Sequence, residues 1–318
     1  MTTRLSPYRL GATLYMPATR NDIADIVLNN RIEGLRSLVI DLEDAISEAE
    51  IPIALTHLRR VLQRLSAAKN VASGSERPLV FIRPRHLAMS KQLIEREDLG
   101  SIDGLVLPKF TLASLPAWWE IIQHTSLNIM PTLETEEVFD VAKMRELAVA
   151  LAEHPCHERV IALRIGGNDL MNVISLRRPR NLTLYDGPMG YVIKMLVAVF
   201  SARDFALTSP VCEHIDEQNV LERELALDIA HGLVGKTAIH PNQISTIEQA
   251  LRVSSADHED ALRILNSRQA VFKSQGAMCE PATHRRWALR VLEQAQIYGI
   301  WQDGGQDGVR LVNLTQKH

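Results

Sequence analysis

The sequence predicts a (β/α)8 barrel followed by a C-terminal helical extension. Short apolar runs alternate along the chain with longer segments of helical periodicity, a pattern typical of βα units around a parallel sheet. Several of the apolar runs are nearly continuous, as expected of strands that are buried on both faces. Eight such units favour a closed barrel, although a doubly wound open sheet gives a similar pattern.

The barrel elements are expected within residues 1–254. Runs rich in Val, Ile and Leu, bounded by polar or turn residues, indicate the strands. The strands are expected near residues 13–16, 37–40, 79–82, 104–107, 128–131, 160–165, 206–208 and 234–239. Apolar residues that recur three and four positions apart indicate the helices. The helices are expected near residues 22–30, 47–66, 90–97, 112–125, 136–153, 188–202, 217–231 and 243–253.

Residues 255–318 exceed what a barrel needs and are expected to form a helical extension with a tail. Two helices are expected there, at 257–273 and 281–298, separated by a break at Gly276. Pro281 suits the first turn of the second helix, and Gly299 suits its C-terminal stop. The segment from Trp301 to His318 is expected to be a loosely held tail.

Composition and charge argue against a nucleic-acid-binding protein and against a membrane protein. The 318 residues carry a net charge of −3, which gives no electrostatic reason to expect a nucleic-acid partner. The most apolar stretch, residues 191–200, is too short to span a bilayer, and the N-terminus lacks the apolar segment of a signal peptide. Three cysteines in a long chain favour a reducing compartment, so we expect a cytoplasmic protein without a membrane partner.

Polar residues follow the predicted strands at the end where a parallel barrel carries its chemistry. In chain order these residues are Arg20, Asp41, Glu43, Asp44, Arg83, Arg85, Lys109, Glu134, Asn168, Asp169 and His240. So many acids and bases on one rim exceed what the stability of a barrel requires. The candidates for contact with a substrate are Arg20, Arg83, Lys109, Gly167 and Asn168.

Glu134 and Asp169 are the candidate metal ligands. Each follows an apolar run directly, so both side chains should point into the mouth of the barrel from adjacent strands. Carboxylate oxygens without a nearby Cys or His suit Mg²⁺, or Mn²⁺, better than Zn²⁺. The alternative is that both residues cap the helices that follow them, which is a common role for acids.

Arg83 is a charged residue at the end of a strand that should be buried. A guanidinium group there can bind a substrate carboxylate through two parallel hydrogen bonds. The alternative is a structural ion pair with one of the acids in the segment 41–44. Three acids in four positions are unfavourable beside a strand end unless cations or a hydrated metal ion face them.

The same positions carry an ordered set of motifs that resembles the citrate lyase β-subunit-like group of the HpcH/HpaI aldolase superfamily. The set spans about residues 10 to 300 and keeps the order of the group. The motifs are LYMPATR with Arg20, VIDLEDA at 39–45, FIRPR with Arg83, LVLPK at 105–109, PTLET with Glu134, GGNDL with Asp169 and AIHPNQI at 238–244.

This resemblance implies a (β/α)8 barrel with a C-terminal helical extension, assembled as a homotrimer or hexamer. It implies that Glu134 and Asp169 hold Mg²⁺ and that Arg83 binds a substrate carboxylate. Members of the group break or form carbon–carbon bonds next to a carbonyl, often in acyl-CoA esters. A divalent ion and nearby cations stabilise the enolate that such a cleavage releases.

The chain also departs from the group. Where acyl-CoA members carry a lysine and an aspartate that reaches a neighbouring subunit, this chain has GAMCEP, with Ala277 and Glu280. The stretch Arg177–Tyr185 is also unusual. A CoA thioester is therefore a weaker expectation than a small carboxylated substrate. These departures resemble a divergent carbon–carbon lyase branch found in stress and tellurium-resistance gene clusters. The chain lacks the histidine after the second strand that is typical of the pyruvate aldolase branch.

Three functions remain open at the level of sequence. The first is a Mg²⁺-dependent lyase or condensing enzyme, and the second is a thioesterase on the same scaffold. The third is a non-catalytic barrel that binds a small acid in a stress-response complex. For an enzyme, the candidates for the general acid or base are Asp41, Glu43, Asp44 and Glu280.

Overall fold

The structure, a computed structural model, describes residues 5–69 and 77–302 of the chain. The chain is divided into two compact units, residues 1–245 and 246–318. Within the described residues, no helix has the length and apolar character needed to cross a membrane.

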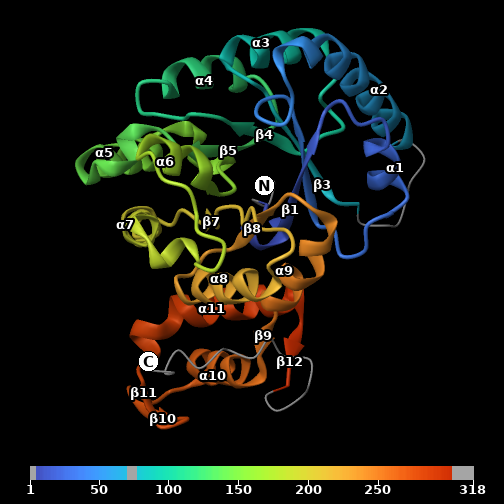
Figure 1. The fold of residues 1–318 in the computed structure, drawn as a ribbon. Helices are drawn as coiled ribbons and strands as arrows, with labels where there is room; N and C mark the ends of the chain where they lie inside the picture. The colour runs from blue at the N-terminus through green and yellow to red at the C-terminus, as the bar shows by residue number, and fades with distance from the viewer. Residues whose placement is uncertain (1–4, 70–76, 303–318) are drawn as a thin grey trace. The chain divides into compact units, whose positions relative to one another are not determined.

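Eight parallel strands form the sheet of the first unit, in the order β7-β6-β5-β4-β3-β2-β1-β8 (Figure 1). They are β1 (Gly11–Pro17), β2 (Ser37–Asp41), β3 (Leu79–Arg83), β4 (Gly104–Leu107), β5 (Asn128–Leu133), β6 (Leu163–Ile165), β7 (Leu207–Thr208) and β8 (Gly235–Ala238). The two ends of this order meet, because Ser209 N donates to Gly235 O at 2.7 Å and Val234 N donates to Leu207 O at 3.0 Å. The closed barrel is confirmed, and the open sheet is excluded.

Helices follow the strands and surround them (Figure 1). They are α1 (Ile23–Leu28), α2 (Ile51–Lys69), α3 (Leu87–Arg96), α4 (Leu115–Ile122), α5 (Val141–Glu153), α6 (Gly167–Val173), α7 (Pro188–Ser201) and α8 (Gln218–Ala230). The helix expected at 136–153 is interrupted at Asp140, which is extended and caps α5 by accepting hydrogen bonds from Ala142 N and Lys143 N. Helix α6 was not predicted, because its 7 residues give fewer than two turns of periodicity.

The inside of the barrel contains polar side chains. Ser37 Oγ donates to Thr13 Oγ1 at 3.0 Å, and Arg164 Nη2 donates to Thr237 Oγ1 at 2.5 Å. Arg164 lies on β6, which is not a neighbour of β1 or β8 in the sheet, so its bonds to Thr13 and Thr237 cross the barrel interior. The outer faces of the strands are apolar and pack under the helices, with Leu38 and Ile40 fully buried.

The second unit contains α10 (Ser255–Asn266) and α11 (Pro281–Tyr298), and α9 (Ile244–Ala250) lies across the boundary in the sequence. The expected helix at 281–298 is confirmed. The buried side chains of this unit include Ala261, Ile264, Ala288 and Val291, so the two long helices share one apolar core.

The helix expected at 257–273 is wrong in its second half. Helix α10 ends at Asn266, and β10 (Phe272–Ser274) pairs antiparallel with β11 (Ala277–Cys279). Gln275 and Gly276 connect them with φ angles of 46° and 85°, the left-handed pair that suits a two-residue hairpin turn. The expected break at Gly276 is therefore the tip of a hairpin.

The tail was expected to begin at Trp301, which instead belongs to a short strand. Strand β12 (Ile300–Trp301) pairs in parallel with β9 (Val253–Ser254) within the second unit. Residues 303–318, the rest of the expected tail, lie outside the described residues.

Candidate active site

A cavity of about 320 Å³ lies at the carboxyl ends of the barrel strands, a volume suited to a small molecule. It is lined by Tyr15, Pro17, Asp41, Asp44, Ala45, Arg83, Thr132, Glu134, Arg164, Ile165, Gly166, Gly167, Asn168, Asp169, Val211, Thr237 and Ile239. Seven residues that the sequence singled out are therefore brought together here, namely Asp41, Asp44, Arg83, Glu134, Gly167, Asn168 and Asp169.

Glu134 and Asp169 face this cavity from neighbouring strand ends. Glu134 directly follows β5, and Asp169 lies in the first turn of α6 after β6. Glu134 is 4% exposed, and its Oε1 accepts a hydrogen bond from Lys109 N at 2.7 Å. Burial raises the pKa of Glu134 to about 8; the Lys109 N–H opposes this rise, while the negative charge of Asp169 adds to it. A cation beside the two carboxylates would relieve this unfavourable burial of charge.

Gly166 keeps the space beside Glu134 free. A Cβ atom at Gly166 would overlap the side chain of Glu134, including Oε2. The first glycine of the GGNDL motif is therefore needed for steric reasons, because any larger residue would displace the carboxylate. This close approach fixes the carboxylate in the wall of the cavity.

The donor set at this point fits a hard divalent cation. Across the described ranges, no group of three or more His, Cys, Asp or Glu side chains gathers as a metal site. Mg²⁺ commonly takes only one or two carboxylates and completes its octahedron with water or substrate oxygens. Two carboxylates at the wall of an open cavity, Glu134 and Asp169, match that requirement.

Lys109 connects the two acidic parts of the site. Its Nζ donates to Glu43 Oε1 at 2.7 Å and lies 3.6 Å from Asp169 Oδ1. Lys109 has a φ angle of 47°, a left-handed conformation that turns the chain directly after β4. Burial acts to lower the pKa of Lys109, but the hydrogen bond to Glu43 and the surrounding carboxylates outweigh it and raise the pKa. Lys109 is therefore a permanent cation at this rim.

Arg83 is held by the acids that follow β2. Its Nε and Nη2 each donate to one oxygen of Asp41 at 2.7 Å. Its Nη1 lies 3.1 Å from Glu43 Oε2 and 3.1 Å from Asp44 Oδ2. Asp41 also accepts hydrogen bonds from Glu43 N and Ala45 N, so both of its oxygens are fully used. The structural pair that the sequence left open is thus present, and Arg83 still lines the cavity.

Glu43 and Asp44 differ in their surroundings. Glu43 is 5% exposed, and burial raises its pKa, although Arg83 and Lys109 oppose the rise. The side chain of Asp44 is 55% exposed and lines the cavity. Of the two, Asp44 is therefore the acid that a molecule in the cavity can touch.

Four predicted site residues are not among those that line the cavity, namely Arg20, Glu43, Lys109 and Glu280. Arg20 does not line the cavity, and its guanidinium group binds Asp22 at the surface, at 2.6 Å between Nη2 and Oδ2. Glu280 belongs to the second unit, where it precedes α11 and its backbone N donates to His284 Nδ1 at 3.0 Å.

Arg85 binds the segment that follows β2, and His240 binds its own loop. Arg85 Nη2 donates to Ile46 O at 2.6 Å, and its Nη1 pairs with Glu48 at 3.2 Å. His240 Nδ1 accepts a hydrogen bond from Asn242 N at 3.2 Å. Neither residue lines the cavity.

Arg164 and Tyr15 are among the cavity residues that the sequence analysis missed. Arg164, 2% exposed, lies within β6, and Tyr15 lies on β1. The guanidinium carbon of Arg164 lies 5.2 Å from the centre of the Tyr15 ring, and that of Arg83 lies 5.0 Å from it. The signal in the sequence was the arginine itself, a charge in the middle of the apolar run VIALRI.

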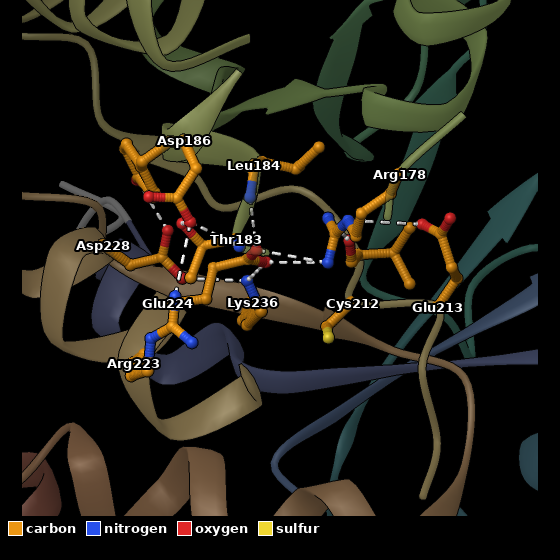
Figure 2. A network of polar contacts seen from close by, with 12 residues as sticks. Arg178, Thr183, Leu184, Asp186, Cys212, Glu213, Arg223, Glu224, Asp228 and Lys236 are labelled. Carbon is orange, nitrogen blue, oxygen red and sulfur yellow. Dashed lines mark hydrogen bonds and ion pairs between the residues drawn. The ribbon is translucent and has the colours of Figure 1, made fainter. Parts of the chain in front are cut away.

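Behind the wall of the cavity lies a buried network of charges, shown in Figure 2. Lys236 Nζ donates to Glu224 Oε1 and to Asp228 Oδ2, both at 2.8 Å. Arg178 Nη1 lies 3.1 Å from Glu224 Oε2. All four side chains are buried, and their two positive and two negative charges balance.

This network anchors the unusual stretch 177–185 to the barrel. Leu184 N donates to Glu224 Oε2 at 2.9 Å, and Tyr185 Oη donates to Asp228 Oδ1 at 2.7 Å (Figure 2 shows the bond to Leu184). Arg178 Nη2 donates to the carbonyl of Val211 at 2.9 Å, and Val211 lines the cavity. The stretch therefore supports one wall of the cavity.

Comparisons with known proteins find relatives of similar sequence and fold. The chain is 22% identical over 266 residues to a (3S)-malyl-CoA thioesterase of Cereibacter sphaeroides, covering 83% of this chain and 84% of that protein. It superimposes on the CitE protein of Mycobacterium tuberculosis in complex with magnesium, acetoacetate and coenzyme A, with a TM-score of 0.63 and 21% identity over 91% of this chain and 99% of that one. A second structure, the citrate lyase β subunit of M. tuberculosis with oxaloacetate and magnesium, gives a TM-score of 0.53 and 22% identity over 76% and 98% of the chains.

The family itself is identified by a match along almost the whole chain. The model of the carbon–carbon bond lyases of the TIM-barrel fold matches residues 4–300. This match confirms the resemblance drawn from the ordered motifs. With its closed eight-stranded barrel and the acids and bases at its carboxyl rim, the chain belongs to the family of carbon–carbon bond lyases of the TIM-barrel fold.

Proposed function

We propose that the protein is a Mg²⁺-dependent carbon–carbon lyase that acts on a small carboxylated carbonyl compound. The observation that carries this proposal is that Glu134, Asp169 and Arg83 line one cavity. Glu134 and Asp169 would hold the ion, and Arg83 would bind a carboxylate of the substrate. A bound Mg²⁺ supplies Lewis-acid stabilisation of the negative charge that develops when the bond breaks. The solved CitE structures with magnesium and small carboxylates support the proposal.

The residues of the chain have distinct roles in this proposal. Cleavage of a β-hydroxy acid needs a base that takes the hydroxyl proton while the electrons of the carbon–carbon bond pass to the departing enolate. Asp44 is the proposed base, because it lines the cavity. Asp41 positions Arg83, since both of its oxygens are already bonded. Lys109, held by Glu43, provides a positive charge at the rim.

Thioester hydrolysis is the second candidate activity. The malyl-CoA thioesterases of Cereibacter sphaeroides support it, at 22–23% identity. The same carboxylates and Arg83 could then position a water molecule against a thioester. The two activities differ in their products, because only hydrolysis of the thioester leaves the acyl carbon skeleton intact.

We propose further that the protein assembles as a trimer or hexamer in the cytoplasm. The resemblance of its motif implies that Glu280 acts as an acid or base at the cavity of a neighbouring subunit. The three cysteines are unpaired and buried, which fits a reducing compartment. Light scattering at micromolar concentration tests the assembly, and a monomer would exclude Glu280 as an acid supplied by a neighbouring subunit.

The proposed activity is tested by product analysis. Purified protein with Mg²⁺ is incubated with short β-hydroxy acids and with their CoA thioesters, and the products are identified by mass spectrometry. Shortened carbon skeletons that disappear with EDTA, and in the Asp169→Asn variant, are the expected result. Free acids of unchanged length would favour the thioesterase. Products that persist in EDTA would contradict the metal-dependent mechanism.

A further inference from the structure

Arg164 is a buried cation at the floor of the cavity without an acid of its own. Its guanidinium group donates to Thr237 Oγ1 at 2.5 Å and to Thr13 Oγ1 at 3.5 Å, and Nη1 lies 3.8 Å from the sulfur of Met130. Among the described residues, no carboxylate lies within ion-pair distance of it. Arg83, by contrast, faces three acids. The ring of Tyr15, centred 5.2 Å from the guanidinium carbon of Arg164, is a further uncharged neighbour. A buried charge whose close partners are all uncharged is unfavourable unless an anion joins it.

Two hydroxyl groups near Arg164 can form further hydrogen bonds. Thr132 lies opposite Arg164 in the β5–β6 register and lines the cavity, and its buried Oγ1 has no hydrogen-bond partner among the described residues. Thr237 Oγ1 accepts from Arg164, so its own proton is free to be donated to another group. A guanidinium fork with two nearby hydroxyl donors is a set that matches the oxygens of a carboxylate.

This floor lies below the proposed metal ligands rather than among them. Thr132 lies on β5 and precedes Glu134 by two residues, and Arg164 lies on β6 and precedes Gly166 by two residues. At about 3.3 Å per strand residue, the two levels are separated by about 7 Å. The charge of Glu134 does reach Arg164. In the proposed function, however, that carboxylate is bound to the ion.

We propose that Arg164, with the hydroxyl groups of Thr132 and Thr237, binds a second carboxylate of the substrate. The substrate would then be a short dicarboxylate that extends from the rim of the cavity to its floor. One end would meet Glu134, Asp169 and Arg83 at the rim, and the other end would meet Arg164 at the floor. This inference rests on the proposed function for the upper end of the substrate. The lower subsite is a separate property of the barrel interior.

The test uses two ligands that differ only at the lower end. Malate and 2-hydroxybutyrate share the hydroxy acid group, and malate carries a carboxylate where the other carries a methyl group. Calorimetry with excess Mg²⁺ should show that the wild-type protein binds malate roughly 10- to 100-fold more tightly, the range expected for a charge-assisted hydrogen-bond pair. Equal affinities, or no binding of malate, would overturn the inference.

Two variants test whether the preference for malate comes from Arg164 and Thr132. Arg164→Met should abolish the preference and leave the affinity for 2-hydroxybutyrate unchanged, with a melting temperature that does not fall. Thr132→Val should reduce the preference by roughly two- to tenfold. Thr208→Val is the matched control, because Thr208 Oγ1 is also buried without a hydrogen-bond partner in the described part of the chain but does not line the cavity. A preference retained in Arg164→Met, with or without a lower melting temperature, would mean that Arg164 does not bind the second carboxylate.

The outcomes separate this inference from the proposed function. If no carbon–carbon cleavage is detected but the malate preference exists and requires Arg164, the subsite stands and the lyase proposal falls. If Mg²⁺-dependent cleavage is detected and Arg164→Met keeps the wild-type preference, the lyase stands and the subsite falls.

Discussion

The guanidinium group of Arg83 forms a two-pronged ion pair with Asp41, with Nε and Nη2 each 2.7 Å from a carboxylate oxygen. The pair joins the ends of β3 and β2, which are adjacent in the sheet. It leaves Nη1 as the edge that faces Glu43 and Asp44. Arg83 therefore forms the structural ion pair that the sequence left as one alternative. It also lines the cavity, where carboxylate binding is the role that we propose for it.

Replacing Arg83 with lysine should weaken both roles. Lysine keeps the charge but cannot form the planar fork, so the affinity for a carboxylate ligand should fall by roughly 1.5–3 kcal/mol. Because the fork also joins two strands in a buried setting, the melting temperature should fall too. Asp41→Asn is the comparison, since it loosens the fork and keeps the arginine. Ligand affinity that stays intact in Arg83→Lys would assign Arg83 to structure alone.

Mg²⁺ binding should depend on pH through Glu134. Burial raises the pKa of its carboxyl group to about 8, so below that pH a proton competes with the ion. Mg²⁺ affinity should therefore rise as the pH increases from 6 to about 9, with release of a proton on binding. Calorimetry in buffers of different ionisation enthalpy measures this release. An affinity that is flat over this range would contradict the assignment.

The stability of the metal-free protein should show the opposite trend. A carboxyl group whose folded-state pKa is raised contributes stability that is fully present below its unfolded pKa, and the contribution is lost as the pH rises through the folded value. For Glu134 the window runs from about 4.5 to about 8. Chemical unfolding in EDTA should therefore show a decline across this window that Glu134→Gln removes. A decline of equal size in the variant would show that another group titrates.

Gly166→Ala should damage the metal site without unfolding the barrel. The added Cβ would overlap the Glu134 carboxylate and displace it, so Mg²⁺ affinity should fall by at least about tenfold, the size typical of a disturbed ligand support. Gly187→Ala is the matched control, because a Cβ at that position meets nothing within 4 Å. Equal Mg²⁺ affinities for the two variants would show that Glu134 is not a ligand.

The buried network should be sensitive to loss of its central cation. Lys236→Met leaves Glu224 and Asp228 buried without the lysine, so the free energy of unfolding should fall by roughly 3–5 kcal/mol. Adding Asp228→Asn should recover part of the loss, because it removes one of the stranded charges. Urea unfolding of the single and double variants measures both effects. A double variant as unstable as the sum of its single variants would contradict this coupling.

Much of the fold and the rim could be predicted because their signals are local. Glu134 directly follows an apolar run, and Asp169 lies just beyond another, after Gly166, Gly167 and Asn168. Such positions in a parallel barrel lie at the carboxyl rim. Helix α11 was predicted at both ends because Pro281 and Gly299 mark them. The structural role of these residues can be inferred from their immediate neighbours in the sequence.

The remaining features depend on contacts between distant segments. Arg164 could not be assigned from sequence, because its role depends on Thr13 and Thr237, which are 151 and 73 positions away. The hairpin at Gln275 was taken for a helix end, since a two-residue turn and a helix stop both use glycine. The placement of Arg20 depended on Asp22, a surface partner that its position after the first strand did not indicate.

The central claim is that Glu134 and Asp169 form one Mg²⁺ site, and Mg²⁺ titration calorimetry tests it most directly. The wild-type protein at pH 8 should bind one Mg²⁺ per chain, and Glu134→Gln and Asp169→Asn should each weaken binding by more than about tenfold. Glu136→Gln is the matched control, because Glu136 is an exposed acid just beyond Glu134 and should leave Mg²⁺ affinity unchanged. A wild-type protein that binds no Mg²⁺, or one whose affinity survives in both site variants, would contradict the account.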